Sequence, residues 1–333
     1  MKKNITLPYN NKIVLKGYHW PQSEFDKLNE NQIFYLALNF TSKCNLRCPY
    51  CFVGHKCLNR DYNELLITDK KRLITEGKKL GAKVLVIPGR GEPFLDKDFW
   101  EIIDFANDLG IWVVVYTNGG FLNSKTIERL KQAQISLYIK VDSFKETIYD
   151  ELVGLKGTFK IVKGKLDYLL KTFHKPEIIN GNVITRIGLN SVITKQSVDS
   201  IPEIYNFCKR NNIYYTCRSP VKVGQADETW EYLTGNKANI LRQIGKKYSA
   251  RNFTSATPNN QCGIYRFGIT VENNGDIYMC PDAREYFEPI GNIKDKSLSE
   301  LIEIRNKKYP LNSEPGYCFV KAHRNPEEKI RQF

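Results

Sequence analysis

Six short apolar runs alternate with helical stretches over residues 33 to 216, and this alternation is what most limits the possible folds. The runs lie at 33–40, 84–88, 111–116, 137–141, 183–192 and 213–216, and helical patterns lie between them at 68–80, 98–109, 124–133 and 200–211. Repeated strand–helix units predict an α/β fold with a parallel sheet and the helices outside it. In such folds the active site gathers at the carboxyl ends of the strands. The loops that follow the strands are therefore where we look for chemistry.

The loop after the first run carries three cysteines. Cys44, Cys48 and Cys51 have the spacing C-x₃-C-x₂-C, which is too tight for a disulfide framework. Three thiolates can each bind one iron of a cubic iron–sulfur cluster, and the fourth iron then stays open to a ligand that is not protein. A zinc site would normally show a second Cys or His pair nearby, and only His55 and Cys57 are close in sequence.

This cysteine loop resembles the cluster loop of the radical S-adenosylmethionine (radical SAM) family. The resemblance implies a [4Fe–4S] cluster and S-adenosylmethionine as cofactors, and a partial (β/α)6 barrel as the fold. It also places Tyr50 and Phe52 of the loop beside the cofactor. The activity implied is reductive cleavage of S-adenosylmethionine to a 5′-deoxyadenosyl radical, which removes a hydrogen atom from a substrate.

The loop after the second run, residues 88–95, resembles the family's GGEP motif. In the family this motif holds the amino group of S-adenosylmethionine, which implies such a role for Gly91, Glu92 and Pro93, and an acidic oxygen at Glu92 suits an ammonium. Arg90 stands where the family usually has the first glycine, and an ordinary glycine-rich turn is the alternative.

Polar residues also end the later strands. Thr117 and Asn118 after the third run resemble family contacts to the ribose or methionine part of the cofactor. Four residues on or after the fourth and fifth runs are further candidates, which we list as Ser143, Asn190, Lys140 and Arg186. The pairs Asp142-Ser143 and Asn190-Ser191 could contact cofactor or substrate, or be structural. Lys140 and Arg186 would suit a substrate carboxylate or phosphate if they point inward, but a slip of one residue in strand phase would turn them outward.

A second cysteine-containing region begins near residue 262. Two β-like runs flank Asn-Asn-Gly-Asp at 273–276, which predicts a hairpin, and Ser297 with Glu300 predicts a capped helix start. The region resembles the SPASM/twitch extension of radical SAM enzymes, a C-terminal α+β module. The resemblance implies a second, auxiliary [4Fe–4S] cluster, with ligands Cys262, Cys280 and Cys318.

The fourth ligand of that cluster stays open: His323, a cysteine of the barrel, or no residue at all. The alternative is that Cys262, Cys280 and Cys318 are ordinary buried thiols that bind no cluster. Among the other cysteines, Cys208 is expected to pack in the core. Cys217 ends the sixth run, where its thiol could return a hydrogen atom to a substrate radical, which makes it the candidate catalytic residue for an epimerase. Core packing and ligation of the second cluster are alternatives for Cys217.

Composition excludes some classes of protein. The sequence shows no signal segment, which favours a cytoplasmic location, and there its nine cysteines are expected to bind metal rather than form disulfides. No apolar run is long enough to cross a membrane. The net charge of +14 comes from scattered lysines and arginines with no dense basic tract. Nucleic-acid binding is therefore possible but not indicated.

We divide the chain into an arm (1–32) predicted to be irregular, the barrel (33–225), a connecting helical segment (226–260) and the twitch/SPASM-like module (261–333). Only 43 residues precede Cys44, fewer than in family members with a leader-peptide-binding domain. We therefore expect a small polar substrate, sugar or amino-acid-like, that is oxidised or epimerised with electrons from an external donor such as flavodoxin or ferredoxin. A peptide or protein maturase with a separate recruitment partner, and an RNA-modifying enzyme, are the alternatives.

Overall fold

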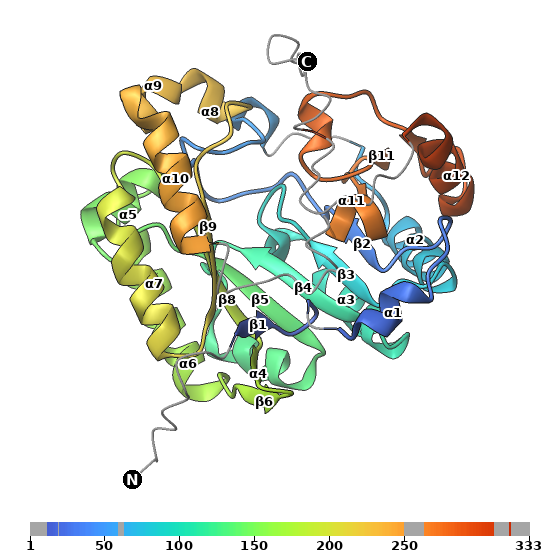
Figure 1. Ribbon diagram of the computed structural model, residues 1–333, viewed down its shortest axis with the longest axis horizontal. Coiled ribbons are helices and arrows are strands. Elements are labelled where there is room, and N and C mark those ends of the chain that lie inside the picture. Colours follow the sequence, from blue (N-terminus) through green and yellow to red (C-terminus); the bar gives the residue numbers. More distant parts are fainter. Residues whose placement is uncertain (1–11, 19, 59–62, 250–262, 310–319, 321–333) are drawn as a thin grey trace.

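The computed structural model describes residues 12–18, 20–58, 63–249, 263–309 and 320. Its centre is a run of six parallel strands that follow one another in chain order, as the strand–helix alternation predicts. These are β2 (Tyr35–Leu38), β3 (Val84–Ile87), β4 (Trp112–Thr117), β5 (Ile135–Lys140), β8 (Ile187–Val192) and β9 (Tyr214–Arg218). The predicted α/β fold is thus confirmed, with a sheet that curves as in a partial barrel (Figure 1).

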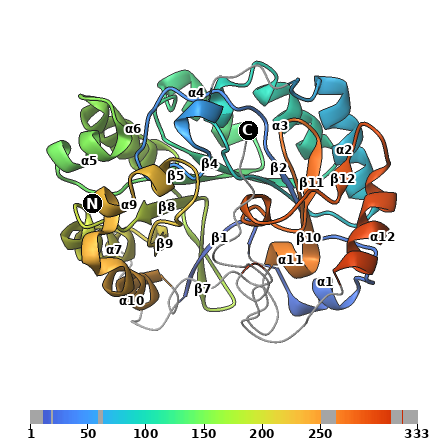
Figure 2. The same ribbon diagram turned by 90° about the horizontal axis from the view of Figure 1, so that it is seen from above.

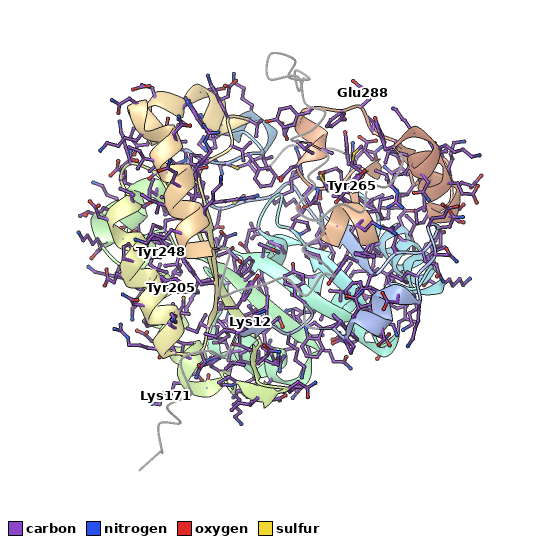
Figure 3. The ribbon with its side chains drawn as sticks, in the orientation of Figure 1. Lys12, Lys171, Tyr205, Tyr248, Tyr265 and Glu288 are labelled. Atoms are coloured by element: carbon purple, nitrogen blue, oxygen red, sulfur yellow. The ribbon has the colours of Figure 1, made fainter. Side chains whose placement is uncertain are left out.

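Helices cover the outer face of these strands and surround them when the molecule is seen from above (Figure 2). They are α2 (Ile67–Lys79), α3 (Phe99–Asp108), α4 (Ser124–Gln132), α5 (Glu146–Val153), α6 (Thr158–Thr172), α7 (Ile201–Arg210) and α10 (Ala238–Ser249). In α4, Asn123 caps the first turn through Thr126 N, and Ile127 and Leu130 are buried. Tyr205 of α7 and Tyr248 of α10 pack ring to ring at 5.3 Å between centroids, which joins the last helices of the barrel (Figure 3).

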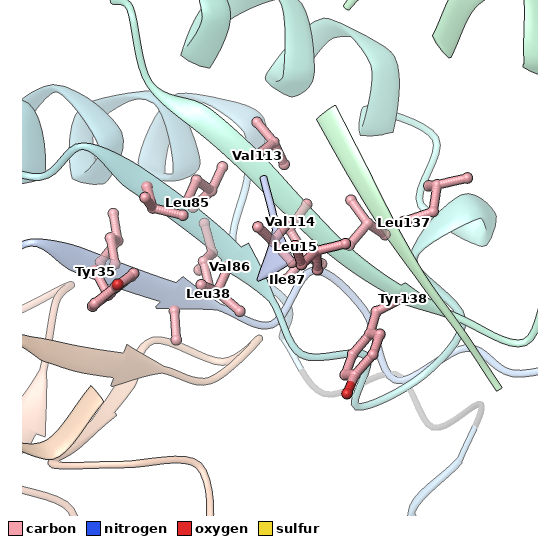
Figure 4. Packing of buried hydrophobic residues seen from close by; sticks show 14 of the residues in the cluster. Leu15, Tyr35, Leu38, Leu85, Val86, Ile87, Val113, Val114, Leu137 and Tyr138 are labelled. Atoms are coloured by element: carbon pink, nitrogen blue, oxygen red, sulfur yellow. The ribbon is translucent and has the colours of Figure 1, made fainter. Parts of the chain in front are cut away.

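The core lies between the strands and these helices (Figure 4). All four residues of β3, Val-Leu-Val-Ile, are buried, which is typical of a parallel strand that is covered on both faces. None of the described helices combines the length and the apolar character needed to cross a bilayer.

The C-terminal part of the described chain extends the same sheet. β10 (Gly268–Val271) lies parallel to β2 and antiparallel to β11 (Asp276–Tyr278), which pairs with β12 (Gly291–Asn292). The hairpin predicted at 273–276 and the capping box of Ser297 and Glu300 are both confirmed, the latter at the start of α12 (Leu298–Lys308). Helix α12 packs against α2 (Figure 1). The short helices α8 (Gln225–Glu228) and α9 (Trp230–Thr234) lie between β9 and α10, and α11 (Gly263–Phe267) directly precedes β10.

The prediction of an irregular arm over residues 1–32 is wrong for its described part. β1 (Ile13–Leu15) pairs in parallel with β7 (Asn182–Thr185), and α1 (Gln22–Asp26) buries Phe25 against Phe34, with 4.4 Å between ring centroids. A three-residue strand shows no periodicity of its own, and its partner lies about 170 residues further along the chain. Local pattern therefore could not reveal it.

The single run predicted at 183–192 is also wrong, because the structure divides it. β7 pairs with β1 and with β6 (Glu177–Ile179) in a separate three-stranded sheet, and β8 joins the main sheet. Arg186 stands at the break and donates hydrogen bonds to the carbonyls of Leu130, Ala133 and Ile135. The guanidinium thus satisfies the end of α4 rather than a ligand.

Candidate active site

A cavity of about 620 Å³ lies inside the curved sheet and reaches the loops at its carboxyl end. Twelve of the candidate site residues from the sequence line it. These are Cys44, Cys48, Tyr50, Cys51, Phe52, Gly91, Glu92, Thr117, Asn118, Lys140, Asn190 and Cys217. The topology therefore gathers residues as far apart in the chain as Cys44 and Cys217 around one volume, as the rule for parallel strands predicts.

Contacts from distant parts of the chain fix the shape of the cysteine loop. Gln225 N donates to Cys51 O at 2.8 Å, Thr229 Oγ1 to Pro49 O at 2.7 Å, and Arg47 N to Val153 O at 3.0 Å. Each contact satisfies a backbone polar group of a loop that has no regular structure. The loop is thus held before anything binds to it.

Two of the three cysteines, Cys44 and Cys48, lie in an environment that disfavours free thiolates. Burial raises the pKa of the Cys44 thiol to about 11 and also raises the pKa of the Cys48 thiol. A thiolate in this place is stable only beside a cation, and an iron ion supplies that charge.

Glu92 is the central polar group of the cavity wall. It is 2% exposed, and its carboxylate accepts hydrogen bonds from Thr117 Oγ1 at 2.7 Å and Asn118 N at 2.8 Å. Burial raises the pKa of the Glu92 carboxyl to about 7, against the lowering effect of these hydrogen bonds. A buried carboxylate of this kind is stabilised by a cationic ligand.

Gly91 sits where its loop touches the cysteine loop. Its N–H donates to Thr41 O at 3.0 Å, and a Cβ built on it would lie 2.2 Å from Lys43 O. Only glycine allows this approach of two backbones. The glycine thus fixes Glu92 and the cysteines relative to each other.

Asp142, of the candidate pair Asp142-Ser143, joins the cysteine loop to the sheet. This fully buried carboxylate accepts from Tyr50 Oη at 2.5 Å and Val192 N at 2.7 Å, and it pairs with Lys140 Nζ. Lys140 lies over the Tyr50 ring and lines the cavity. Its side chain therefore points inward, which is one of the two strand phases that the sequence left open. Burial lowers the pKa of the Lys140 ammonium, and Asp142 opposes this shift. Of this pair we listed Ser143 as the site residue, but Asp142 makes the contact with the cysteine loop.

Other candidates lie elsewhere. Pro93 is buried and begins the 3₁₀ turn Pro93–Leu95, outside the cavity wall. Ser143 Oγ contacts Ser200 Oγ at 2.8 Å, so it joins the loop after β5 to α7 and does not line the cavity. Arg186 binds backbone carbonyls, as described above, because it lies at a break between strands and not within one. These three side chains are therefore placed to support structure.

The two buried thiols near β9 differ in position. Cys208 is fully buried in α7, as predicted. Cys217 belongs to the wall of the cavity and is 3% exposed. Because side chains alternate along a strand, its thiol lies on the same face as Tyr215, whose hydroxyl is its hydrogen-bond partner. Burial raises the pKa of the Cys217 thiol to about 11. Its neighbour Thr216 takes the opposite face.

Arg90, in the position where the motif usually has glycine, forms a buried ion pair with the C-terminal part of the sheet. Its Nη1 lies 3.0 Å from Glu272 Oε2, and Arg284 Nη1 lies 2.9 Å from the same oxygen. Glu272 follows β10, so this pair joins the GGEP-like loop to the added strands. The departure from the motif thus has a structural partner.

Comparison with known proteins identifies the family. Residues 38–194 match the family model described as the Radical SAM superfamily. Residues 38–194 of this chain are a radical SAM domain. The family's [4Fe–4S] cluster and S-adenosylmethionine are the cofactors of this domain.

Two curated relatives and one solved structure illustrate the range of this family. The chain is 30% identical over 180 residues to the Fe-coproporphyrin III synthase of Methanosarcina barkeri, and the aligned residues cover 54% of this chain and 42% of that protein. It is 24% identical over 309 residues to the probable GTP 3′,8-cyclase of Methanocaldococcus jannaschii, covering 89% and 96%. Streptococcus suis SuiB bound to its precursor peptide SuiA has the same fold, with a TM-score of 0.60 and 18% identity over 84% of this chain and 67% of that one. This chain thus spans less than half the length of the synthase.

The residues of this radical SAM domain fit its cluster. Among the described residues, no three His, Cys, Asp or Glu side chains converge on a point that would suit a single metal ion. A cubic cluster needs no such convergence, since each thiolate binds a different iron. Three cysteines on one loop, facing a cavity that also holds Glu92, are the donor set that a cluster with one open iron requires.

The ligands predicted for the second cluster of this chain are described only in part. Cys280 is half-buried after β11, and the two residues that follow it, Pro281 and Asp282, line the cavity. Cys262, Cys318 and His323 lie outside the described residues.

Proposed function

We propose that this enzyme removes a hydrogen atom from a small polar substrate, sugar or amino-acid-like, bound in the cavity beside S-adenosylmethionine. The observation that carries the proposal is that the three cysteines and the buried Glu92 line one cavity. Members of the superfamily share this first half of the reaction, and the substrate distinguishes them.

The residues of the cavity divide the work. When bound and reduced, the cluster together with S-adenosylmethionine supplies a 5′-deoxyadenosyl radical that takes a hydrogen atom from an unactivated C–H bond. Cys44, Cys48 and Cys51 would each hold one iron, and Glu92 would accept from the amino group of S-adenosylmethionine. Thr117 and Asn118 hold the Glu92 carboxylate in place through the two hydrogen bonds described above.

We also propose a second [4Fe–4S] cluster on Cys262, Cys280 and Cys318, with an external electron donor such as flavodoxin or ferredoxin. The place of Cys280 directly before two wall residues of the cavity supports this site. An epimerase would need the Cys217 thiol to return a hydrogen atom to the substrate radical. The side chain of Cys217 lies on the strand face of Tyr215 and not on that of Thr216, so we favour oxidation over epimerisation. Under oxidation, Cys217→Ala leaves the product and its deuterium content unchanged in D₂O.

A peptide substrate brought by a separate recruitment protein is the second candidate. Its support is the fold shared with SuiB, which binds the precursor peptide SuiA. The cavity is large enough for one side chain of such a peptide.

Anaerobic reconstitution tests the proposed function. Reduced wild-type protein with S-adenosylmethionine should form 5′-deoxyadenosine, detected by mass spectrometry. The triple variant Cys44→Ala/Cys48→Ala/Cys51→Ala should form none, yet keep about half of the iron if the second cluster exists. Cys208→Ala, which removes a fully buried thiol of α7, is the matched control and should retain activity. Wild-type protein that holds iron but never forms 5′-deoxyadenosine would refute the proposal.

A further inference from the structure

The cavity has two chemically different parts. Its charged lining residues, which we call the rim, are Arg90, Glu92, Lys140, Arg218 and Asp282. Arg90 and Glu92 follow β3, and Lys140 and Arg218 are the last residues of β5 and β9. Asp282 lies 3.8 Å from the Arg218 guanidinium. The charge of the described cavity wall therefore lies at the carboxyl ends of the strands.

Five tyrosines line the other part, which we call the tyrosine chamber: Tyr18, Tyr35, Tyr116, Tyr138 and Tyr214. Tyr35 and Tyr214 are the first residues of β2 and β9, so they lie at the opposite strand ends from the rim. The rings contact one another edge to face, with centroids 6.1 Å apart for Tyr18 and Tyr35 and 4.6 Å apart for Tyr116 and Tyr138. Figure 4 shows Tyr35 and Tyr138 on β2 and β5, on either side of the buried strands β3 and β4.

The backbone is adapted to these rings at Gly188. Tyr138 and Tyr214 flank Gly188 in register on β5, β8 and β9. A Cβ on Gly188 would lie 2.4 Å from Tyr138 Cδ2 and 3.2 Å from Tyr214 Cδ1. The two rings thus occupy the space of a missing side chain, which leaves the volume in front of them open.

One hydroxyl of the chamber is left without a partner. Tyr18 Oη and Tyr116 Oη are 3.2 Å apart, and Tyr138 Oη pairs with Thr216 Oγ1. Tyr35 is 2% exposed, and its hydroxyl has no hydrogen-bond partner among the described residues. An unsatisfied buried hydroxyl costs roughly 1–3 kcal/mol, so a ligand with one polar atom at this place would be favoured.

These features distinguish between substrate classes. A sugar needs many polar partners, whereas the chamber offers aromatic edges and faces and one open hydroxyl. An organic cation would be favoured by a nearby carboxylate, but the acidic residues of the described wall, Glu92 and Asp282, are at the rim. Edge-to-face and tilted tyrosine rings are complementary to a further aromatic ring.

We propose that the tyrosine chamber binds an aromatic ring with one polar substituent, such as the phenol of an aromatic amino acid or of a peptide residue. This inference rests on the proposed function for the location of the substrate, and it narrows the amino-acid-like class to its aromatic members. The charged rim then receives the amino-acid backbone of the substrate.

Binding to reconstituted, S-adenosylmethionine-loaded enzyme tests the inference without turnover. Calorimetric titration with p-cresol should give an affinity at least tenfold higher than with 4-methylcyclohexanol, which carries the same two substituents on a saturated, puckered ring. Tyr35→Phe should weaken p-cresol binding about fivefold, and Tyr168→Phe, an exposed tyrosine of α6, should leave it unchanged. Gly188→Ala should abolish it, and if that variant does not fold, Tyr35→Phe alone decides.

Each other outcome has a defined meaning. Equal binding of p-cresol and 4-methylcyclohexanol, tighter binding of tetramethylammonium, or no effect of Tyr35→Phe would overturn the inference. If these occur while 5′-deoxyadenosine still forms, the proposed function stands without the aromatic substrate. Comparison of L-tyrosine with N-acetyl-L-tyrosinamide separates the two sources of the ring, because only the free amino acid brings charges to the rim.

Discussion

The rim and the tyrosine chamber are two ends of one cavity, but the chain builds them in different ways. Rim residues such as Arg90 and Glu92 belong to loops, next to short sequence motifs. Tyr116 and Tyr138 lie within strands, and Tyr18 comes from the N-terminal arm. Loops after strands can exchange polar groups without disturbing the sheet, whereas chamber residues are also part of the core. The rim is thus suited to chemistry shared across the family, and the chamber to what distinguishes this enzyme.

The largest effect is expected at the rim, for Glu92→Ala. Removal of one partner from a buried charge-assisted contact costs roughly 2–5 kcal/mol, so the affinity for S-adenosylmethionine should fall by a factor of about 30 or more. Equilibrium dialysis with labelled S-adenosylmethionine on the reconstituted enzyme measures it. Glu203→Ala, at an exposed position of α7, is the control. Unchanged affinity in Glu92→Ala would remove Glu92 from the cofactor site.

The pH dependence of stability isolates the same carboxyl. Because burial raises the pKa of Glu92 from 4.5 to about 7, the folded protein keeps a proton that the unfolded chain releases over this range. Stability must therefore fall as the pH rises from about 4.5 to 7, by up to about 3 kcal/mol at ~1.4 kcal/mol per pH unit. Urea unfolding of cluster-free wild type and Glu92→Gln at several pH values gives the difference. If the free energy of unfolding changed with pH in the same way in both proteins, Glu92 would not be a buried carboxyl that lacks a cationic partner.

Gly91→Ala tests whether the rim depends on contact between two loops. The new Cβ would lie 2.2 Å from Lys43 O, so the loops must separate, at a cost of roughly 1–3 kcal/mol. We expect less iron per protein after reconstitution and a lower urea midpoint. Gly164→Ala is the matched control, since no atom lies within 4 Å of its Cβ in α6, and it should stabilise the protein by about 0.5–1 kcal/mol. Equal iron content in Gly91→Ala and wild type would argue against the contact.

The same contrast explains what the sequence could predict. Cys44, Cys48, Cys51 and Glu92 stand in motifs with fixed spacing, and the strand pattern placed their loops at one end of the sheet. The chamber escaped prediction because its rings are far apart in the chain and each tyrosine alone reads as a core residue.

Register and topology account for the remaining differences. Asp142 was passed over for Ser143, since only the fold shows which of two adjacent side chains meets the cysteine loop. Arg186 failed as a candidate because the break between β7 and β8 depends on β1, a partner no local pattern could supply.

The smallest effect is expected in the chamber, for Tyr18→Phe. This change keeps the ring and removes one hydroxyl, which leaves Tyr116 Oη without the partner it has at 3.2 Å. Loss of one such hydrogen bond costs about 0.5–1.5 kcal/mol, so the free energy of unfolding should fall by that amount in urea titration. Tyr168→Phe on α6 is the matched control, and no change is expected there because its ring is exposed.

The cofactor site should not respond to Tyr18→Phe, because its residues lie at the rim. An unchanged affinity for S-adenosylmethionine together with weaker p-cresol binding would show that the arm shapes the chamber alone. If S-adenosylmethionine binding fell as well, the rim and the chamber would act as one site, and the division of the cavity into a shared end and a specific end would fail.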